Sequence, residues 1–318
     1  MRRILVTGAL GQIGSELVPA LRERYGSDNV VASDIRIPPA GSSANGPFEY
    51  LDCTELRQIQ EVVRKYEVDT IYHLAALLSA VAEDRPRVAW ELNMGGLYKV
   101  LEVARGSLCS VFHPSSIGAF GPSTPPNNTP QDTIQRPTTM YGVTKVAGEL
   151  LCDYYHKRFD VDTRGVRYPG LISYVTPCGG GTSDYSVEIF YEAIRNRRYV
   201  CFLRPDARMD MMYMPDAINA AIAIMEADPA RLEHRNAFNV TAMNFTPAEL
   251  ASEIQKHMPE FSIGYDVDPV RQSIADSWPD SIDDSAARQE WDWNPTYDLA
   301  TMTEDMLQNL RKKLKGGE

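Results

Sequence analysis

The residues with the clearest chemical potential are Tyr141 and Lys145, which stand four positions apart in the segment TMYGVTK at residues 139–145. Apolar residues continue at helical spacing after them, so both side chains are expected on one face of a helix. A free tyrosine has a pKa of about 10 and is a weak base near neutral pH. A nearby ammonium favours the phenolate, although a pKa lowered by about 3 units needs roughly 4 kcal/mol. The pair suggests a base, Tyr141, tuned by Lys145, but its spacing also fits a buried tyrosine beside a solvated lysine.

A glycine turn near the start of the chain indicates what such a base would work with. A β-rich run at residues 3–7 leads into Gly8, Gly11 and Gly14, which enclose Gln12 and Ile13, and a helical pattern follows. Glycines at a strand-to-helix turn let a pyrophosphate approach the backbone at the helix N-terminus. The spacing is G-x-x-G-x-x-G rather than G-x-G-x-x-G, and the position after the first strand predicts a dinucleotide site.

The type of dinucleotide follows from the end of the second predicted strand. Asp34 ends the run at residues 30–34, 20 positions after Gly14. A carboxylate there takes the ribose hydroxyls of the adenosine and repels a 2′-phosphate, so the cofactor is expected to be NAD rather than NADP. Ile35 and Arg36 follow and are expected beside the adenosine. The positive charge of Arg36 would favour the 2′-phosphate of NADP and so argues against NAD.

Further small or polar residues stand where predicted strands end. Asp52 and Cys53 follow the strand at 48–51, and Asp52 is expected either to bond the adenine amino group or to cap the next helix. The strand at 70–74 is followed by small residues that let the ribose and phosphates lie close, with Ser79 soon after. Its cofactor-facing residues are Leu74, Ala75 and Ala76.

Two more polar groups precede Tyr141. Asn93 lies in a long helical pattern after Pro86, beside Gly95 and Gly96, whose cost in a helix interior predicts a kink or tight packing. The fifth strand, at 110–113, leads to Ser115 and Ser116. A loop at 120–138 separates these serines from Tyr141 and is able to fold their hydroxyls back toward the phenol.

Strands and helices alternate through this part of the chain and predict an α/β protein with a Rossmann-type, doubly wound parallel sheet whose ligand lies at the carboxyl edge. We expect residues 1–170 to form the NAD-binding domain, with a return segment near 211–240. A sixth strand at 163–168 would bring Tyr168 and Leu171 to the cofactor. Residues 171–318 would form mainly a smaller α/β substrate-binding cap, to which Gly180, Thr182 and Trp278 belong.

Composition excludes several other classes of protein. A net charge of −11 over 318 residues makes nucleic acid a poor partner. No apolar run approaches the roughly 20 residues of a membrane span. The few histidines lack ligand spacing, so no metal is expected. The five cysteines (53, 109, 152, 178 and 201) form no C-x-x-C pair, which predicts a reducing compartment, the cytoplasm.

The combined pattern resembles the extended short-chain dehydrogenase/reductase family. The residues that carry the resemblance are Gly8, Gly11, Gly14, Asp34, Asn93, Ser116, Tyr141 and Lys145. The resemblance implies a Rossmann fold, NAD and an Asn–Ser–Tyr–Lys catalytic set. Longer strings over essentially the whole chain are similar to one group in this family, the short-chain L-threonine 3-dehydrogenases. They are PSSIGAFGP (114–122), TMYGVTK (139–145), GGGT (179–182), MMYMPD (211–216) and IADSWP (274–279).

This narrower resemblance has departures that bear on loop shape and affinity. Cys178 stands where a proline is expected before the triple glycine, and Met209-Asp210 stands where a Leu-Pro pair is expected. The first two strings also fit sugar-nucleotide epimerases, so the last three discriminate.

The implied function is NAD-dependent oxidation of the 3-hydroxyl of L-threonine to 2-amino-3-ketobutyrate, in threonine catabolism. Tyr141 would remove the hydroxyl proton. Lys145 would lower the pKa of Tyr141 and hold the nicotinamide ribose, and Asn93 would hold a water in the proton path. Ser116 would orient the substrate, with Ser115 sharing that task. The remaining substrate contacts are expected from Ser79, Gly180, Thr182 and Trp278. The resemblance also implies a homodimer through the long helices at 86–106 and 141–158.

Two rival functions use the same sequence features. A nucleotide-sugar epimerase or dehydratase needs a roomy basic groove for a diphosphate, which Arg195, Arg197 and Arg198 would furnish. A non-catalytic NAD-sensing protein would keep the glycine turn without needing Tyr141, Lys145 and Ser116 together. A bound nucleotide sugar would favour the first, and cofactor binding without turnover would favour the second.

Overall fold

The largest sheet confirms the predicted doubly wound α/β architecture. The computed structural model describes residues 1–38, 45–177 and 179–315. Six parallel strands follow the order β3-β2-β1-β4-β5-β7. The order reverses between β1 and β4, and ligands of such sheets bind in the crevice beyond the carboxyl ends at that point. The strands are β1 (Ile4–Thr7), β2 (Val30–Asp34), β3 (Phe48–Tyr50), β4 (Thr70–His73), β5 (Ser110–Phe112) and β7 (Thr163–Arg164).

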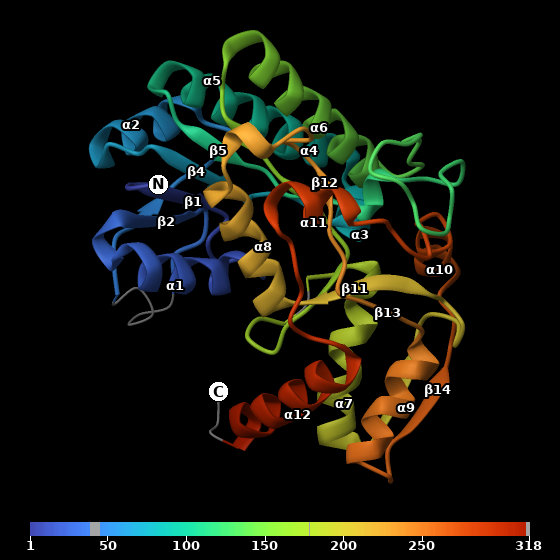
Figure 1. Ribbon diagram of the computed structural model, residues 1–318. Helices are drawn as coiled ribbons and strands as arrows, with labels where there is room; N and C mark the ends of the chain where they lie inside the picture. The colour runs from blue at the N-terminus through green and yellow to red at the C-terminus, as the bar shows by residue number, and fades with distance from the viewer. Residues whose placement is uncertain (39–44, 178, 316–318) are drawn as a thin grey trace.

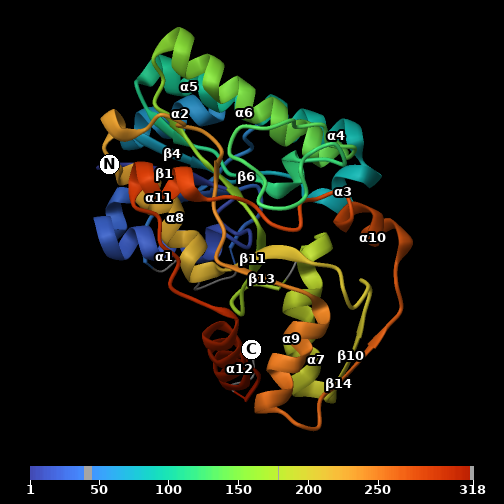
Figure 2. The same cartoon turned by 45° about the vertical axis from the view of Figure 1, so that its right-hand side comes forward.

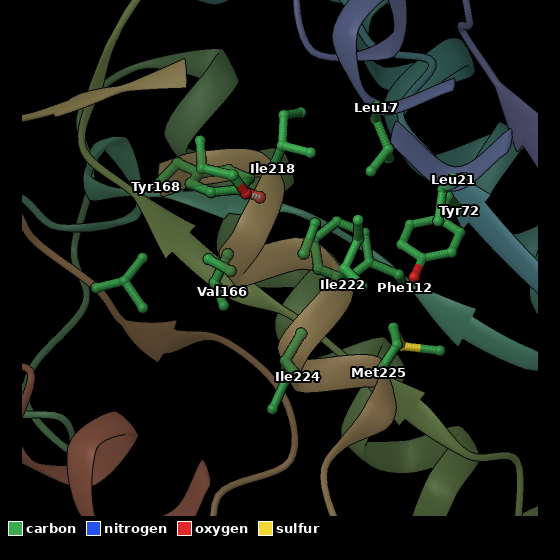
Figure 3. Packing of buried hydrophobic residues seen from close by; sticks show 14 of the residues in the cluster. Leu17, Leu21, Tyr72, Phe112, Val166, Tyr168, Ile218, Ile222, Ile224 and Met225 are labelled. Atoms are coloured by element: carbon green, nitrogen blue, oxygen red, sulfur yellow. Dashed lines mark hydrogen bonds between the residues drawn. The ribbon is translucent and has the colours of Figure 1, made fainter. Parts of the chain in front are cut away.

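Helices cover both faces of this sheet (Figure 1). Successive side chains of a strand point to opposite faces, so Leu5 joins a core with α2, α5 and α6, whereas Ile4 and Val6 join one with α1 and α8. Figure 3 shows Leu17 of α1 and Ile222 of α8 in the second core. The helices of this part are α1 (Gly14–Tyr25), α2 (Leu56–Tyr66), α3 (Ser79–Asp84), α4 (Pro86–Trp90), α5 (Leu97–Ser107), α6 (Met140–Phe159) and α8 (Met214–Glu226), with the short turns η1 (Ser27–Asn29), η3 (Ile117–Ala119) and η5 (Pro229–Arg231).

The predicted sixth strand is wrong as a single element. Gly165 divides it into β7, in the main sheet, and β8 (Val166–Tyr168), which pairs with β6 (Ser115–Ser116) and β12 (Phe238–Asn239). A Cβ on Gly165 would lie 2.2 Å from the carbonyl oxygen of His113, so the two backbones touch where the strand changes sheets. Because of this switch, β8 delivers its side chains beside the serines rather than beside β5.

The glycine pair in the long helix also has a structural explanation. Residues Glu91–Gly96 form a π-helical segment, η2, between α4 and α5. Gly96 packs so tightly that a Cβ would lie 3.0 Å from Cys53 Sγ. Such π-helical segments are rare and frequent at functional sites. The predicted tight packing is therefore confirmed, and Asn93 lies inside the irregular turn.

Most of the remaining elements form a second group with its own apolar core, seen below the main sheet in Figure 2. Strands β13, β11 and β9 make a three-stranded sheet, and β10 pairs with β14. The strands are β9 (Gly170–Ile172), β10 (Arg198–Cys201), β11 (Met209–Tyr213), β13 (Met243–Phe245) and β14 (Ser262–Tyr265). The helices are η4 (Thr182–Asp184), α7 (Tyr185–Asn196), α9 (Pro247–His257), α10 (Pro269–Ala275) and α12 (Leu299–Lys315). Helix α11 (Ser285–Trp291) instead contacts β12 and joins the core that contains α1 and α8.

The expectations about membrane spans and cysteines can be compared with the described residues. Across the described ranges, no helix combines the length and apolar character that crossing a bilayer requires. Cys53, Cys109, Cys152 and Cys201 are all buried free thiols. Cys178, one of the two departures from the expected motifs, lies outside the described residues.

Candidate active site

A pocket opens at the carboxyl edge of the main sheet, where the strand order reverses. It runs from the glycine turn to the segments around Thr182 and Trp278, and Tyr141 and Lys145 lie between them. Most of the predicted site residues line it together. They are Gly8, Gly11, Gln12, Ile13, Gly14, Leu74, Ala76, Ser79, Ser115, Ser116, Tyr141, Lys145, Tyr168, Leu171, Thr182 and Trp278.

Tyr141 meets the hydroxyl of Ser116 at the first turn of α6. Thr139 caps this helix by accepting a hydrogen bond from the amide of Gly142, 3.1 Å away. Ser116 Oγ accepts from the amide of Gly118 at 3.1 Å, which leaves its proton for the phenol oxygen of Tyr141. Gly118 lies under the aromatic ring, since a Cβ there would be 3.2 Å from two ring carbons. The backbone of residues 116–118 therefore sets both the position of Tyr141 and the direction of its hydrogen bond.

Lys145 is buried one turn further along α6. Its Nζ donates to the carbonyl oxygen of Pro114 at 2.7 Å and lies 5.4 Å from the centre of the Tyr141 ring. Burial lowers the pKa of Lys145 to about 8, against the attraction of Glu149. Burial likewise raises the pKa of Tyr141 to about 12, and the hydrogen bond from Ser116 only partly opposes it. The expected lowering of the tyrosine pKa by Lys145 is thus not produced by the protein groups themselves.

The glycine turn has the form that a pyrophosphate requires. Gly8 has a φ of +70°, which favours glycine, and a Cβ there would lie 2.8 Å from the amide nitrogen of Ala75. A Cβ on Gly14 would lie 2.5 Å from the carbonyl oxygen of Gly8, so α1 can begin this close to β1 only with glycine. Gln12 Nε2 is buried there without a hydrogen-bond partner among the described residues. The bare backbone and the unpaired donor fit the pyrophosphate of NAD.

Asp34 lies at the end of β2, beside this turn. Its carboxylate accepts from the amide of Leu10 at 3.0 Å and from the amide and guanidinium of Arg36, also at 3.0 Å. Burial acts to raise the pKa of Asp34, but these hydrogen bonds outweigh it and the net shift is downward. A buried anion at this place fits ribose hydroxyls and opposes a 2′-phosphate. Ile35 and Arg36 are exposed just beyond the strand.

Several predicted residues do not line the pocket, and most of them support the residues that do. Ala75 packs against Gly8, and Cys53 packs against Gly96. Asp52 accepts from the amide and hydroxyl of Thr54 at 2.8 and 2.7 Å, which stabilises the turn before α2. Gly180, with a φ of +92°, belongs to a turn, and its neighbour Gly181 lines the pocket instead.

Asn93 clamps two elements behind the pocket. Its Oδ1 accepts from the amide of Leu77 at 2.8 Å, and its Nδ2 donates to the carbonyl of Leu77 and to Thr144 Oγ1, at 3.2 and 3.1 Å. The side chain therefore joins the loop after β4 to α6. Its polar atoms are already bonded, so the predicted water-holding role stays a prediction.

The far wall of the pocket holds residues that the sequence patterns did not single out. Asp184 and Ser183 line it beside Thr182, whose buried hydroxyl has no hydrogen-bond partner among the described residues. Asp184 Oδ2 accepts from the amides of Gly180 and Gly181, at 2.8 and 2.7 Å. Burial raises the pKa of Asp184. The only sequence signal was its position next to the GGGT string.

Trp278 is both a wall of the pocket and part of a small apolar cluster with Ile117, Phe120 and Ile282. The departure at Met209-Asp210 supports this wall. The buried carboxylate of Asp210 accepts from the amide of Ile282 at 2.7 Å and from Asn244 Nδ2 at 2.9 Å. It thereby ties β11 to the chain that follows Trp278.

Away from the pocket, Glu233, His234 and Glu290 bring potential metal ligands within 4.8 Å of one another. The carboxylate of Glu290 is already bonded to the amides of Glu233 and His234 and to the His234 ring. Asp132 lies 3.4 Å from the other ring nitrogen of His234. These groups therefore stabilise one another as a hydrogen-bonded cluster.

Comparison with known proteins agrees with this geometry. Residues 4–241 match the model of the NAD dependent epimerase/dehydratase family. An uncharacterized epimerase/dehydratase from Staphylococcus haemolyticus is 59% identical over 314 residues, which cover 98% of this chain and 99% of that protein. The L-threonine dehydrogenase from Clostridium difficile has a TM-score of 0.96 and 59% identity, with 98% of each chain covered.

A second solved structure, the holo form of L-threonine dehydrogenase from Cupriavidus necator, has a TM-score of 0.94 and 50% identity. It covers 97% of this chain and 99% of its own. NAD is therefore the cofactor, as predicted. The chain belongs to the NAD-dependent epimerase/dehydratase family of extended short-chain dehydrogenases/reductases.

Proposed function

We propose that this chain oxidises the 3-hydroxyl of L-threonine with NAD, giving 2-amino-3-ketobutyrate, as a step of threonine catabolism. The observation that carries the proposal is a single pocket with three parts: the glycine turn, the Ser116–Tyr141–Lys145 group, and a wall with a carboxylate and an unpaired hydroxyl. The similarity to solved L-threonine dehydrogenases at 50–59% identity supports the same substrate.

The residues of α6 would carry the proton chemistry. When bound, NAD supplies a hydride acceptor, the C4 position of its nicotinamide. Tyr141 takes the proton of the substrate hydroxyl, which must lie within about 3 Å of the phenol oxygen. Ser116 orients that hydroxyl. Because the protein groups alone leave the pKa of Tyr141 raised, the phenolate that proton transfer requires would be stabilised by Lys145, positively charged below its pKa of about 8, together with the positive charge of bound NAD at its nicotinamide. Lys145 would also hold the nicotinamide ribose, as the family resemblance implies.

Asp184 is the group best suited to the substrate ammonium. It is the one carboxylate among the described residues that line the pocket. Backbone amides occupy its Oδ2, and of the described residues none donates a hydrogen bond to Oδ1. Charge-assisted hydrogen bonds are stronger than neutral ones, so an ammonium is a favourable partner for Oδ1. Thr182 and Ser79 then offer hydroxyls to the substrate carboxylate, and Trp278 covers the aliphatic part.

The charges around the pocket weigh against a nucleotide sugar as substrate. Lys145 is the only lysine or arginine among the described residues lining it. Arg195 and Arg198 border a separate surface groove on α7 and β10, and Arg197 is exposed between them. A diphosphate would therefore lack the basic groove that the epimerase alternative needs.

The test is NADH formation at 340 nm with NAD and L-threonine, run beside NADP, L-serine and UDP-glucose. Turnover confined to NAD with L-threonine is the expected result. The Tyr141→Phe variant should bind NAD as the wild type does but lose about 10²- to 10⁴-fold in kcat, the usual cost of losing a general base. Wild-type protein that binds NAD without oxidising L-threonine would contradict the proposal and favour an NAD sensor. Full turnover by Tyr141→Phe would contradict the role of the tyrosine.

We further propose a homodimer that buries the outer face of α4, α5 and α6. These helices pack side by side at the top of Figure 1. Their outer face exposes large apolar side chains of the kind that mark protein interfaces. They are Val88, Trp90, Tyr98, Val143, Leu150 and Tyr154.

The division into an NAD-binding domain at 1–170, with a return at 211–240, and a cap at 171–318 is also part of this proposal. It is supported by the separate apolar core that α7, α9 and α12 share. The four buried free thiols support the predicted cytoplasmic location.

A further inference from the structure

Three consecutive residues, Pro114 and the two serines of β6, contact three successive turns of α6; residues 114–116 are called the serine strand below. Ser116 meets Tyr141, Pro114 accepts from Lys145 Nζ at 2.7 Å, and Ser115 Oγ donates to Glu149 Oε1. Tyr141, Lys145 and Glu149 are spaced by four residues, so they lie along one face of the helix. The third contact has no part in the proposed proton transfer, yet it completes the docking of the strand on the helix.

The side chain of Glu149 is only 6% exposed, and protein groups donate hydrogen bonds to both oxygens of its carboxylate. Oε1 accepts from Ser115 and from Arg167 Nε at 3.1 Å. Oε2 accepts from Arg167 Nη2 at 2.9 Å and from Gln135 Nε2 at 2.8 Å. Ser115 and Arg167 are directly opposite each other on β6 and β8. One carboxylate therefore joins α6 to both strands and to the loop that carries Gln135.

We propose that Glu149 is a positioning residue of the active site, which docks the serine strand on α6 and supplies the negative charge that faces Lys145. The inference rests on the proposed function for the roles of Tyr141 and Lys145. Ser115 is then a link in this docking, since its proton is directed at Glu149 and away from the substrate. Loss of the link would let residues 114–116 shift against Tyr141, and a misplacement of this kind reduces turnover more than binding.

The groups that face Lys145 come from three elements. Tyr141, Glu149 and Cys152 are on α6, His73 ends β4, and His113 follows β5. Burial lowers the pKa of both histidines, to about 3 for His73, so they are neutral near pH 7. Burial raises the pKa of Cys152, so this thiol is neutral as well. Glu149 is thus the anion that favours the protonated form of Lys145. Arg167, the cation that pairs with Glu149, is not among the groups that shift the pKa of Lys145.

The charge can be tested without turnover, by acetylating the NAD-free protein with acetic anhydride at a series of pH values. Peptide mass spectrometry then gives the midpoint at which Lys145 becomes reactive, near pH 8 in the wild type. In Glu149→Gln this midpoint should fall by about one pH unit, because the nearby anion is gone. Asp153→Asn, which removes a charge one turn further along α6, should leave it unchanged. A folded Glu149→Gln protein with the wild-type midpoint would overturn the electrostatic role.

The docking role has its own variants. Ser115→Ala should lower kcat with L-threonine at least tenfold, with an unchanged Kd for NAD. Glu149→Asp, which keeps the charge but shortens the side chain, should lower kcat without moving the Lys145 midpoint. Wild-type kcat in both would refute the docking.

If Glu149→Gln does not fold, the double variant Glu149→Gln/Arg167→Met, which leaves no unpaired buried cation, should give the same lowered midpoint, and an unchanged midpoint there would count against the role. Wild-type protein inactive toward L-threonine would instead refute the proposed function. The acetylation result would still decide the role of Glu149 beside Lys145.

Discussion

Replacing Lys145 by methionine should stabilise the folded chain while abolishing turnover. Burial lowers the pKa of Lys145 from 10.5 to about 8, a difference that corresponds to about 3 kcal/mol at about 1.4 kcal/mol per pH unit. Below pH 8 both the folded and the unfolded chain bind the proton, so this cost of burying the charge is fully present at pH 7. Methionine removes it but leaves the Pro114 carbonyl without its donor, which costs about 1 kcal/mol. The variant should therefore gain about 2 kcal/mol, or about 3 °C in Tm for a chain of this length.

The pH dependence separates this cause from a general effect of methionine. As the pH rises from 8 to 10.5, the wild-type lysine loses its proton and its cost, so the advantage of Lys145→Met should shrink. Urea unfolding at pH 7 and pH 10, at one protein concentration and without NAD, measures both values. Tyr141→Phe serves as a control that removes activity without removing a charge. A Lys145→Met chain less stable than wild type at pH 7, or equally more stable at both pH values, would refute the reasoning.

Three further substitutions test other parts of the molecule. Asp184→Asn should raise the KM for L-threonine about 10- to 100-fold through loss of a charge-assisted hydrogen bond, while the Kd for NAD stays the same; an unchanged KM would remove Asp184 from substrate binding. Gly14→Ala should abolish NAD binding in calorimetry, since its Cβ would lie 2.5 Å from the Gly8 oxygen, whereas Gly106→Ala, with nothing within 4 Å, should bind normally. Leu150→Glu should yield a monomer in light scattering, because it charges a side chain 63% exposed on the proposed dimer face; a dimer of unchanged affinity would contradict that interface.

The parts of the fold that the sequence predicted are those with short-range signals. The strand, glycine turn and helix around Gly8 and Gly14 lie within a few residues of one another, and Asp34 follows from the length of one βαβ unit. Tyr141 and Lys145 follow from the helical repeat alone. The split of the sixth strand at Gly165 was missed, because it depends on contact with the backbone of His113 rather than on any local preference.

The site could be predicted from the sequence only in part, for the same reason. Asp184 stands next to a recognisable string but gains its meaning from the pocket it lines. Asn93 and Ser115 have the residue types expected at a catalytic centre, yet their polar atoms bond to Leu77 and Glu149. Residue type and spacing do not tell which of several nearby partners a side chain will bond.

The sequence by itself therefore determined the fold class, the glycine turn between β1 and α1 and the helical face that carries Tyr141 and Lys145, because periodicity and turn chemistry are local properties of the chain. Tertiary structure alone decided the electrostatics. Burial sets the pKa values of Tyr141 and Lys145 in directions that the pair alone did not predict, and Glu149 acts on Lys145 only because Arg167 and Ser115 hold it in place. Desolvation and charge pairing depend on what is packed around a group, and packing brings together residues far apart in the chain.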